Sequence, residues 1–248
     1  MGWRISIVEV GAIPELPVSI YFPDAPPGAV MEVPCYCFLL RTQGAALLID
    51  TGADPWLAAQ VGFTIVGGGR PAIEAALAQE KMSMDEITYV VHTHLHYDHI
   101  ENDLLFPAAR FFVQRRERTW SASGGGGPFY AGVEEILARL GDRLVEVDGE
   151  VELIPGITLV PNGGHTPGHQ SVLVDTDDST VCICGDIVPM RANLDFICSA
   201  TPDSLATRQF LNRARREGWE MLPGHDPALR RHPWLLAPSG EGPNRPSL

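Results

Sequence analysis

Short apolar runs separated by turn-forming residues recur along the whole chain, and this pattern predicts a protein rich in β-strands. The runs at 35–41 and 45–50 are joined by a short polar segment with one glycine, which is typical of a hairpin. Strands are also predicted at residues 3–10, 87–91, 111–114, 144–147, 151–154, 157–161, 170–175, 180–184 and 219–222. Residues 11–34 contain several prolines and are expected to form an irregular loop. Its Tyr21 and Phe22 could lie at the surface or lean over a pocket.

Helical segments are predicted between these strands. Residues 71–80 begin with a proline suited to a first helical turn and continue with good helix formers. Residues 133–140 place Ile136, Leu137 and Leu140 on one apolar stripe. Helices are also predicted at residues 115–120 and 203–218. Helices that alternate with strands favour a sheet with helices packed on it.

A Gly/Ser-rich segment at residues 121–128 interrupts this pattern. Such a segment has the composition of a flexible linker. It is expected to be either a mobile lid beside the functional site or an exposed insertion, and the sequence leaves both open.

Length and composition narrow the class of protein. With 248 residues, of which 45% are hydrophobic and 20% are charged, the chain is expected to form one domain over residues 1–237. Residues 238–248 are rich in Pro, Gly and Ser and are expected to be a frayed tail. The net charge of −13 argues against DNA or RNA as a partner, because binding phosphates requires clustered Lys and Arg.

Hydropathy and cysteine usage give an expectation for the cellular compartment. No stretch approaches about 18 consecutive apolar residues, so no membrane partner is expected. The N-terminus has no signal-peptide pattern, and a cytoplasmic location is expected. Of the five cysteines, four form two C-x-C pairs inside apolar runs, which favours buried free thiols over disulfides. The oligomeric state is left open.

The densest chemical signal lies at residues 92–99, directly after the predicted strand at 87–91. Four potential metal ligands occur within six residues, namely His94, His96, Asp98 and His99. In an extended chain, alternation directs both His94 and His96 to one face, whereas Asp98 and His99 belong to the turn or helix that follows. This spacing predicts a metal site at the exit of a strand.

Three further ligand candidates each follow a predicted strand, and they are His165, Asp186 and His225. Together with the first cluster they provide five imidazoles and two carboxylates, which suit one or two ions of zinc, manganese or iron(II). Asp50 also ends a strand, and it is expected either to support a ligand or to form a turn.

The remaining histidines are interpreted as structural. His92 precedes the cluster within the strand and is expected to pack or to support a ligand. His169 is expected to be a hydrogen-bonded turn residue, and His232 is expected to be exposed.

The order of these motifs resembles that of the metallo-β-lactamase superfamily. The resemblance rests on H-x-H-x-D-H at 94–99, the Gly-His-Thr-Pro-Gly-His turn at 164–169, Asp186, the Gly-His pair at 224–225 and residues 49–52. It implies an α/β fold, the αβ/βα four-layer sandwich, in which two β-sheets pack face to face with helices outside. It also implies that one metal is held by His94, His96 and His165 and the other by Asp98, His99 and His225, with Asp186 bridging both.

Within the superfamily, residues 93–99, 105–107 and 165–171 are similar to the N-acyl homoserine lactonases. In that group a metal-bridging hydroxide attacks the lactone carbonyl, and the bridging Asp can pass a proton to the leaving alkoxide. The resemblance therefore implies that Asp98 and Asp186 are catalytic carboxylates. Two departures put the lactone substrate in doubt. The lactonases carry a tyrosine where this chain has Pro189, three residues after the bridging Asp, and commonly a glycine where it has Glu101.

These observations lead us to expect a dinuclear metal-dependent hydrolase that opens a small ring ester or amide, with zinc as the first choice of metal and a small molecule as its substrate. A glyoxalase II-like thioesterase would use the same seven ligands and is the main alternative. A mononuclear iron enzyme like the persulfide dioxygenases and a binding module without turnover are further alternatives. The acidic charge disfavours a nuclease, and the N-terminus disfavours an exported β-lactamase.

Overall fold

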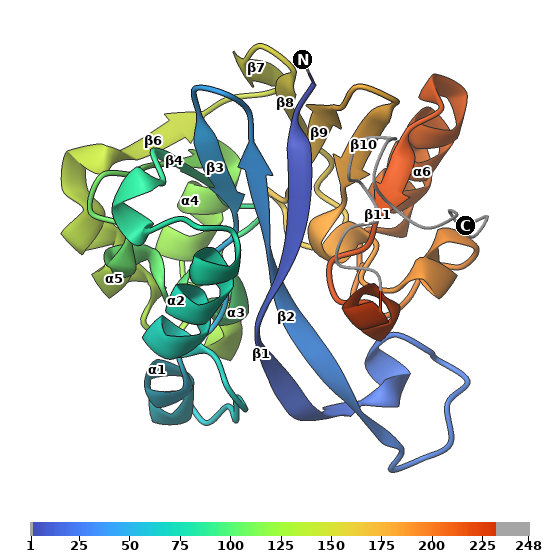
Figure 1. Ribbon diagram of the computed structural model, residues 1–248. Coiled ribbons are helices and arrows are strands. Elements are labelled where there is room, and N and C mark those ends of the chain that lie inside the picture. The colour runs from blue at the N-terminus through green and yellow to red at the C-terminus, as the bar shows by residue number, and fades with distance from the viewer. Residues whose placement is uncertain (1, 232–248) are drawn as a thin grey trace.

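Two β-sheets lie face to face at the centre of the molecule (Figure 1). In this computed structural model, which describes residues 2–231, the first sheet has the order β1-β2-β3-β4-β5-β6 and the second the order β11-β10-β9-β8-β7. The first sheet consists of β1 Arg4–Pro17, β2 Val30–Arg41, β3 Ala46–Ile49, β4 Tyr89–Val91, β5 Arg110–Gln114 and β6 Leu144–Val147. The second consists of β7 Val151–Ile154, β8 Ile157–Pro161, β9 Gln170–Asp175, β10 Thr180–Ile183 and β11 Glu220–Leu222. Strands β3 to β6 are parallel, so their carboxyl ends lie at one edge of the sheet.

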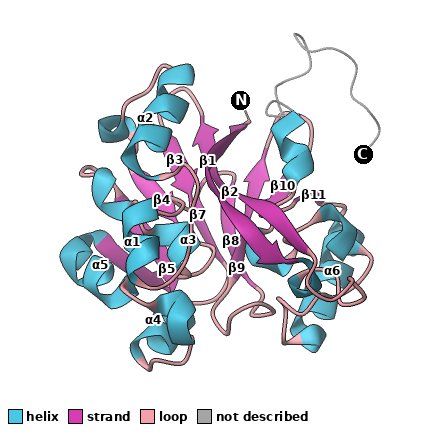
Figure 2. Cartoon of the chain, turned by 90° about the horizontal axis from the view of Figure 1, so that it is seen from below, coloured by secondary structure: helices cyan, strands magenta, loops and turns pink. Residues whose placement is uncertain are grey.

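Helices cover the outer faces of both sheets (Figure 2). They are α1 Pro55–Gln60, α2 Gly69–Gln79, α3 Tyr97–Ile100, α4 Arg115–Ala122, α5 Val133–Leu140 and α6 Ser204–Glu217. Ile73 of α2 and Ile136 of α5 belong to the core on the outer face of the first sheet. Phe210 and Leu211 of α6 belong to the core on the outer face of the second sheet. The order helix, sheet, sheet, helix confirms the expected αβ/βα sandwich.

Strand β2 shows how alternating side chains build two of these cores. One face of β2 joins the core beneath α2 and α5, through Cys35, Cys37 and Leu39. The other face joins the core between the two sheets, through Tyr36, Phe38 and Leu40. Because successive side chains of a strand point to opposite faces, a strand buried on both sides reads as a continuous apolar run. All five cysteines of the chain are buried and free.

The expectation of an irregular loop over residues 11–34 was wrong at both of its ends. Strand β1 continues to Pro17 and β2 begins at Val30, so only residues 18–29 connect them. The pairing of β1 with β2 contains two register shifts, the first of which includes Gly11 at φ 127°. Bulges of this kind, and prolines on an edge strand, interrupt the alternation by which a strand is recognised.

Most of the Gly/Ser-rich segment is exposed, in agreement with an exposed insertion, but two of its glycines lie against aromatic rings. Helix α4 runs to Ala122, and a short 3-10 helix occupies Gly127–Tyr130. A Cβ on Gly125 would lie 2.7 Å from the ring of Trp120, and one on Gly126 would lie 1.8 Å from the ring of Tyr130. The glycines therefore allow two aromatic rings to lie against the backbone.

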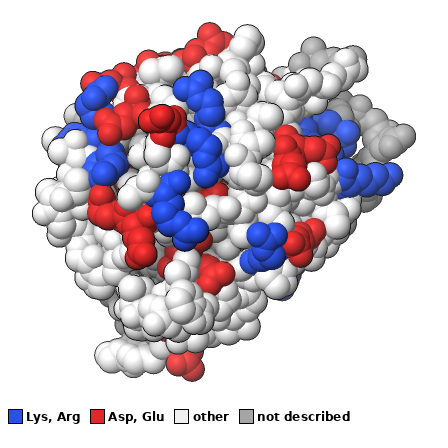
Figure 3. Space-filling view, turned by 90° about the vertical axis from the view of Figure 1, so that its left-hand side faces the viewer, with Lys and Arg blue, Asp and Glu red and all other residues white. Residues whose placement is uncertain are grey.

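Several expectations concern the ends and the surface of the chain. The predicted tail at 238–248 and His232 lie outside the described residues, and the domain limits stay a prediction. Within residues 2–231, no helix is both long enough and apolar enough to cross a membrane. Basic and acidic side chains are interspersed on the face seen in Figure 3.

Candidate metal centre

The seven predicted ligand residues lie at the carboxyl ends of strands, and the structure brings all of them together. His94 and His96 follow β4, Asp98 and His99 lie in α3, His165 follows β8, Asp186 lies in a 3-10 turn after β10, and His225 follows β11. Four of them therefore come from the first sheet and three from the second. The site is built where the edges of the two sheets meet.

Potential ligand atoms of these residues form three overlapping groups. The groups are His94, His96 and His165; His94, His99 and Asp186; and Asp98, His99 and His225, and the atoms of each group lie within 4.8 Å of one another. The first and third groups are the two trios implied by the resemblance. The second group shares His94 with the first and His99 with the third, and it places Asp186 between the two trios.

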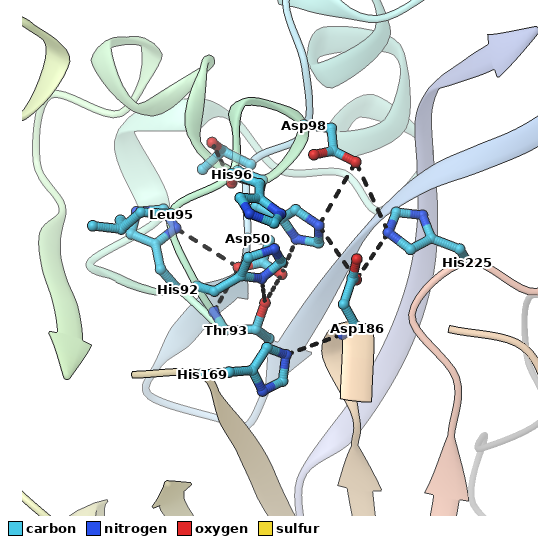
Figure 4. A network of polar contacts seen from close by, with 12 residues as sticks. Asp50, His92, Thr93, Leu95, His96, Asp98, His169, Asp186 and His225 are labelled. Atoms are coloured by element: carbon cyan, nitrogen blue, oxygen red, sulfur yellow. Dashed lines mark hydrogen bonds and ion pairs between the residues drawn. The ribbon is translucent and has the colours of Figure 1, made fainter. Parts of the chain in front are cut away.

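Asp186 occupies the middle of the cluster (Figure 4). Its Oδ1 lies 3.0 Å from Nε2 of His225 and 3.4 Å from Nε2 of His99, and its Oδ2 lies 3.5 Å from Nε2 of His165. Burial alone would raise the pKa of Asp186, but His225, His99 and His165 outweigh it and hold the pKa well below its ordinary value. A carboxylate is thus maintained among imidazoles from both sheets.

Four of the imidazoles are oriented by oxygen atoms that contact Nδ1, and for His94 this atom is Oγ1 of Thr93 at 3.1 Å. Nδ1 of His99 lies 2.8 Å from Oδ2 of Asp50, and Nδ1 of His225 lies 2.7 Å from the carbonyl oxygen of Pro34. Nδ1 of His165 contacts the carbonyl oxygen of Ala200. A donor hydrogen on Nδ1 leaves Nε2 with its lone pair free, which is the arrangement found in metal-binding histidines.

Buried polar atoms without a hydrogen bond provide the test of whether the residues suit a metal. Among the described residues, six buried side-chain polar atoms have no hydrogen-bond partner. Four of the six belong to this cluster, and they are Nε2 of His94, His99 and His225 and Oδ1 of Asp186; the last two atoms lie 3.0 Å apart as an ion-pair contact, without forming a hydrogen bond. Such atoms are costly to bury unless a further group satisfies them. Borderline divalent ions prefer the nitrogen and oxygen donors present, so the residues fit a metal site.

Asp50 is not one of the seven candidate ligands, but it contacts residues of the cluster. Its carboxylate accepts hydrogen bonds from the backbone N–H and the hydroxyl of Thr93, both at 2.8 Å, as well as contacting His99. Burial would raise the pKa of Asp50, but His99 and His92 outweigh it and hold the pKa below its ordinary value. Of the two roles left open for Asp50, the structure therefore supports the first, although its φ of 59° also places it in a turn.

The other two histidines near the centre are hydrogen bonded. Nε2 of His92 lies 3.0 Å from Oδ2 of Asp103, which raises the pKa of His92 to about 9 although its burial acts to lower that pKa. Nε2 of His169 accepts a hydrogen bond from the backbone N–H of Asp186 at 3.0 Å. Both histidines are thus packed around the ligand set, as predicted.

Glu117 is a further residue of the site that the sequence interpretation missed. It lies in α4, is completely buried and accepts hydrogen bonds from the backbone N–H of Leu95 and of Gly168, both at 3.1 Å. The hydroxyls of Tyr130 and Thr166 also donate to it. Glu117 thereby joins the two loops that carry His94, His96 and His165. The only signal in the sequence was a carboxylate within a helical turn, which is usually solvent-exposed.

Glu101 replaces a glycine common in the lactonases. Its Oε2 accepts a hydrogen bond from the backbone N–H of Asp54 at 2.8 Å, and burial raises the pKa of Glu101 to about 8. Asp54 is the N-cap of α1, a helix that was not predicted. Glu101 therefore anchors the start of α1.

An open cavity of about 860 Å³ adjoins the metal centre. Four of the ligand candidates line it, namely His96, Asp98, His165 and Asp186. The rest of its wall is largely apolar and includes Ile13, Leu16, Ile20, Phe63 and Phe129. A cavity of this size and character suits a small organic molecule with an apolar portion.

The sequence model that defines the metallo-beta-lactamase superfamily matches residues 30–228 of this chain. The chain belongs to this superfamily. An N-acyl homoserine lactonase from a Bacillus species is 31% identical over 163 residues, and a probable metallo-hydrolase from Mycobacterium bovis is 29% identical over 191 residues. The match to the Bacillus lactonase covers 62% of this chain and 63% of the lactonase, and so less than two thirds of its length.

Solved structures extend the likeness over more of the superfamily fold. A quorum-quenching N-acyl homoserine lactone lactonase superposes with a TM-score of 0.79 at 25% identity, covering 93% of this chain and 95% of the other. A Bacillus thuringiensis lactonase mutant with N-decanoyl-L-homoserine bound at its active site superposes with a TM-score of 0.78 at 25% identity, covering 93% and 96%. The chain thus shares the superfamily fold with these lactonases over most of its length.

Proposed function

We propose that this protein is a dinuclear metal-dependent hydrolase that opens a small ring ester or amide, in the manner of a lactonase. The observation that carries the proposal is the set of three overlapping ligand groups, with Asp186 in the middle group, beside a largely apolar cavity. His94, His96 and His165 would hold one ion, and Asp98, His99 and His225 the other. Zinc is proposed as the metal because imidazole and carboxylate donors suit it, with manganese or iron as alternatives.

Two ions at this site, when bound, supply Lewis-acid polarisation of a carbonyl oxygen and a lowered pKa for water. The residues of the chain perform the other tasks. Hydrolysis of a ring ester adds a hydroxide to the acyl carbon, breaks the bond from that carbon to the ring oxygen and transfers a proton to that oxygen. Asp98 and Asp186 are the carboxylates in the cavity wall that can carry this proton.

The choice of a ring ester rests on the relatives and on the cavity. The related lactonases act on N-acyl homoserine lactones by their names, and the apolar wall here suits a substrate with an acyl portion. A thioesterase with the same ligands is the alternative. Replacement of the lactonase tyrosine by Pro189 is the reason to test both substrates.

The first test is metal content measured together with a hydrolysis screen of acyl homoserine lactones, other lactones, cyclic amides and thioesters. About two ions per chain with ring opening would support the proposal. Two ions with thioester cleavage alone would favour the thioesterase, and a single iron would favour an oxygenase.

Variants assign the activity to this centre. Asp186→Ala is expected to lose bound metal and turnover together, because it removes the carboxylate that links the ligand groups. Asp85→Ala, at an exposed carboxylate in Met84–Glu86, is the matched control and should keep both. Full turnover in folded Asp186→Ala protein would overturn the mechanism.

We also propose a reducing compartment such as the cytoplasm. The five free, buried cysteines support this proposal, because disulfides are favoured in oxidising compartments. Mass measurement of the protein alkylated under denaturing conditions directly after cell lysis would test it, with five modified thiols expected.

A further inference from the structure

A tyrosine from the connection between β1 and β2 forms part of the cavity wall at the metal centre. Tyr21 follows the 3-10 turn Val18–Ile20 and is only 4% exposed. Its ring belongs to a small core with Val33, Met190 and Cys198. Tyr21 lines the same cavity as the ligand candidates His96, Asp98, His165 and Asp186. The phenol side chain of Tyr21, near the N-terminus of the sequence, is thus placed beside the candidate metal centre.

The hydroxyl of Tyr21 has no hydrogen-bond partner within the part of the chain that the structure describes. Among residues 2–231, no hydrogen bond to this hydroxyl is formed, yet it is not one of the polar atoms sealed away from solvent. A buried tyrosine ring usually directs its hydroxyl to a hydrogen-bond partner. Because Tyr21 lines the cavity, the cavity is where this hydroxyl can meet one.

The backbone around Tyr21 is fixed to the metal centre. Nδ2 of Asn193 donates to the carbonyl oxygen of Tyr21 at 3.0 Å, and the backbone N–H of Ala200 donates to the carbonyl oxygen of Ile20 at 3.2 Å. The carbonyl oxygen of Ala200 also contacts Nδ1 of His165. One short segment therefore positions both a ligand candidate and Tyr21, which is the preorganisation that a functional group requires.

The surroundings of Tyr21 keep its hydroxyl protonated. Burial raises the pKa of Tyr21 well above its ordinary value, and the nearby carboxylates of Asp186 and Asp98 raise it further. A neutral phenol can donate a hydrogen bond to an oxygen atom that gains negative charge.

Two other positions, 189 and 97, are less suited to donate such a hydrogen bond. Pro189, at the place where lactonases carry a tyrosine, has no hydroxyl, and its carbonyl oxygen accepts a hydrogen bond from the backbone N–H of His225 at 2.8 Å. Tyr97 also lines the cavity, but its ring stacks on Phe63 with centroids 4.3 Å apart and an interplanar angle of 6°. Stacking of this kind accounts for Tyr97 as a packed aromatic residue of the wall.

We propose that Tyr21 is a catalytic residue whose hydroxyl donates a hydrogen bond to the substrate carbonyl oxygen as negative charge develops on it. The inference rests on the proposed hydrolysis for the nature of the reaction. It assigns the donor to the β1–β2 connection rather than to the segment after Asp186.

The test compares Tyr21→Phe with Tyr89→Phe, a control in β4 whose ring packs against Phe112. Loss of one such donor is expected to lower kcat by about 100-fold with a smaller change in KM. Zinc content should stay the same in both variants, because Tyr21 is not a ligand. In calorimetry with hexanoate as a probe carboxylate, the zinc-loaded Tyr21→Phe variant should bind about tenfold more weakly than the wild type.

Each outcome decides the proposal. Unchanged kcat and unchanged hexanoate affinity in Tyr21→Phe would overturn it, as would a larger loss of kcat in Tyr97→Phe, which would make Tyr97 the donor. Loss of zinc in Tyr21→Phe would reveal a structural role and also overturn it. If the wild type opens no ring ester but Tyr21→Phe still weakens hexanoate binding, the hydrogen bond to a ligand oxygen stands and the proposed substrate class fails.

Discussion

At the scale of single residues, the orientation of the imidazoles depends on groups that are not themselves candidate ligands. Two of the four oxygen atoms that contact Nδ1 atoms of the candidate ligands are backbone carbonyls, from Pro34 and Ala200. Every residue has a carbonyl oxygen, so the sequence carries no sign of which carbonyl will be used. Only the folded chain places these carbonyls beside His225 and His165.

Glu117 is the residue where a single substitution should test this support. All four hydrogen-bond partners of Glu117 donate to its carboxylate oxygens. Glu117→Gln replaces one of these accepting oxygens by an NH₂ group, which would then face an N–H or O–H donor and could not accept from it. The free energy of unfolding is expected to fall by about 1–3 kcal/mol, the cost of an unsatisfied buried group. Zinc affinity is expected to fall by about tenfold, because both ligand loops lose a shared anchor.

Urea unfolding and zinc titration measure these effects. Glu74→Gln is the control, because Glu74 forms an exposed ion pair with Arg70 and should change stability by less than about 0.5 kcal/mol. Equal stability of Glu117→Gln and Glu74→Gln would show that Glu117 does not hold the loops together.

At the scale of elements, glycines decide how the segment after α4 packs. The composition of residues 121–128 is typical of a linker, but the absence of a side chain serves close contact here. Gly126 lies against the ring of Tyr130, whose hydroxyl donates to Glu117. The segment thereby supports the same loops through Glu117.

Gly126→Ala is expected to destabilise the protein. The new Cβ would lie 1.8 Å from the ring of Tyr130, so the ring must move, at a cost of about 1–3 kcal/mol. Gly44→Ala is the matched control, because nothing lies within 4 Å of its Cβ position and its φ is not positive. Thermal melting of both variants measures the difference. A Gly126→Ala variant as stable as Gly44→Ala would mean that the segment behaves as a linker.

At the scale of the whole molecule, the candidate centre lies between the two sheets. His94, His96, Asp98 and His99 follow the first sheet, whereas His165, Asp186 and His225 follow the second. A metal that binds residues from both sides would join the sheets at this edge. Metal binding should therefore stabilise the entire fold rather than one loop.

Removal of metal is expected to lower the melting temperature. Zinc at about 1,000 times its Kd adds roughly 4 kcal/mol to the free energy of unfolding, which corresponds to roughly 10 °C for a domain of this size. Calorimetry of chelated protein, with zinc and then magnesium added back, provides the measurement. Zinc should restore the melting temperature and magnesium should not, because magnesium prefers oxygen ligands. Identical melting of chelated and zinc-loaded protein would contradict a metal between the sheets.

The sequence by itself determined the candidate ligands and most of the elements, although not helix α1. Apolar runs of strand length located the strands of both sheets, and H-x-H-x-D-H identified a metal motif, because these are local patterns of neighbouring residues. It did not reveal the extension of β1 past Gly11, where bulges break the alternation. Glu117 could not be recognised, and for Tyr21 the sequence left the surface and a pocket wall equally open, because the contacts of both residues are with residues far away along the chain. Only the tertiary structure decided which carbonyls orient the histidines and which phenol reaches the cavity, since packing of the two sheets sets those distances.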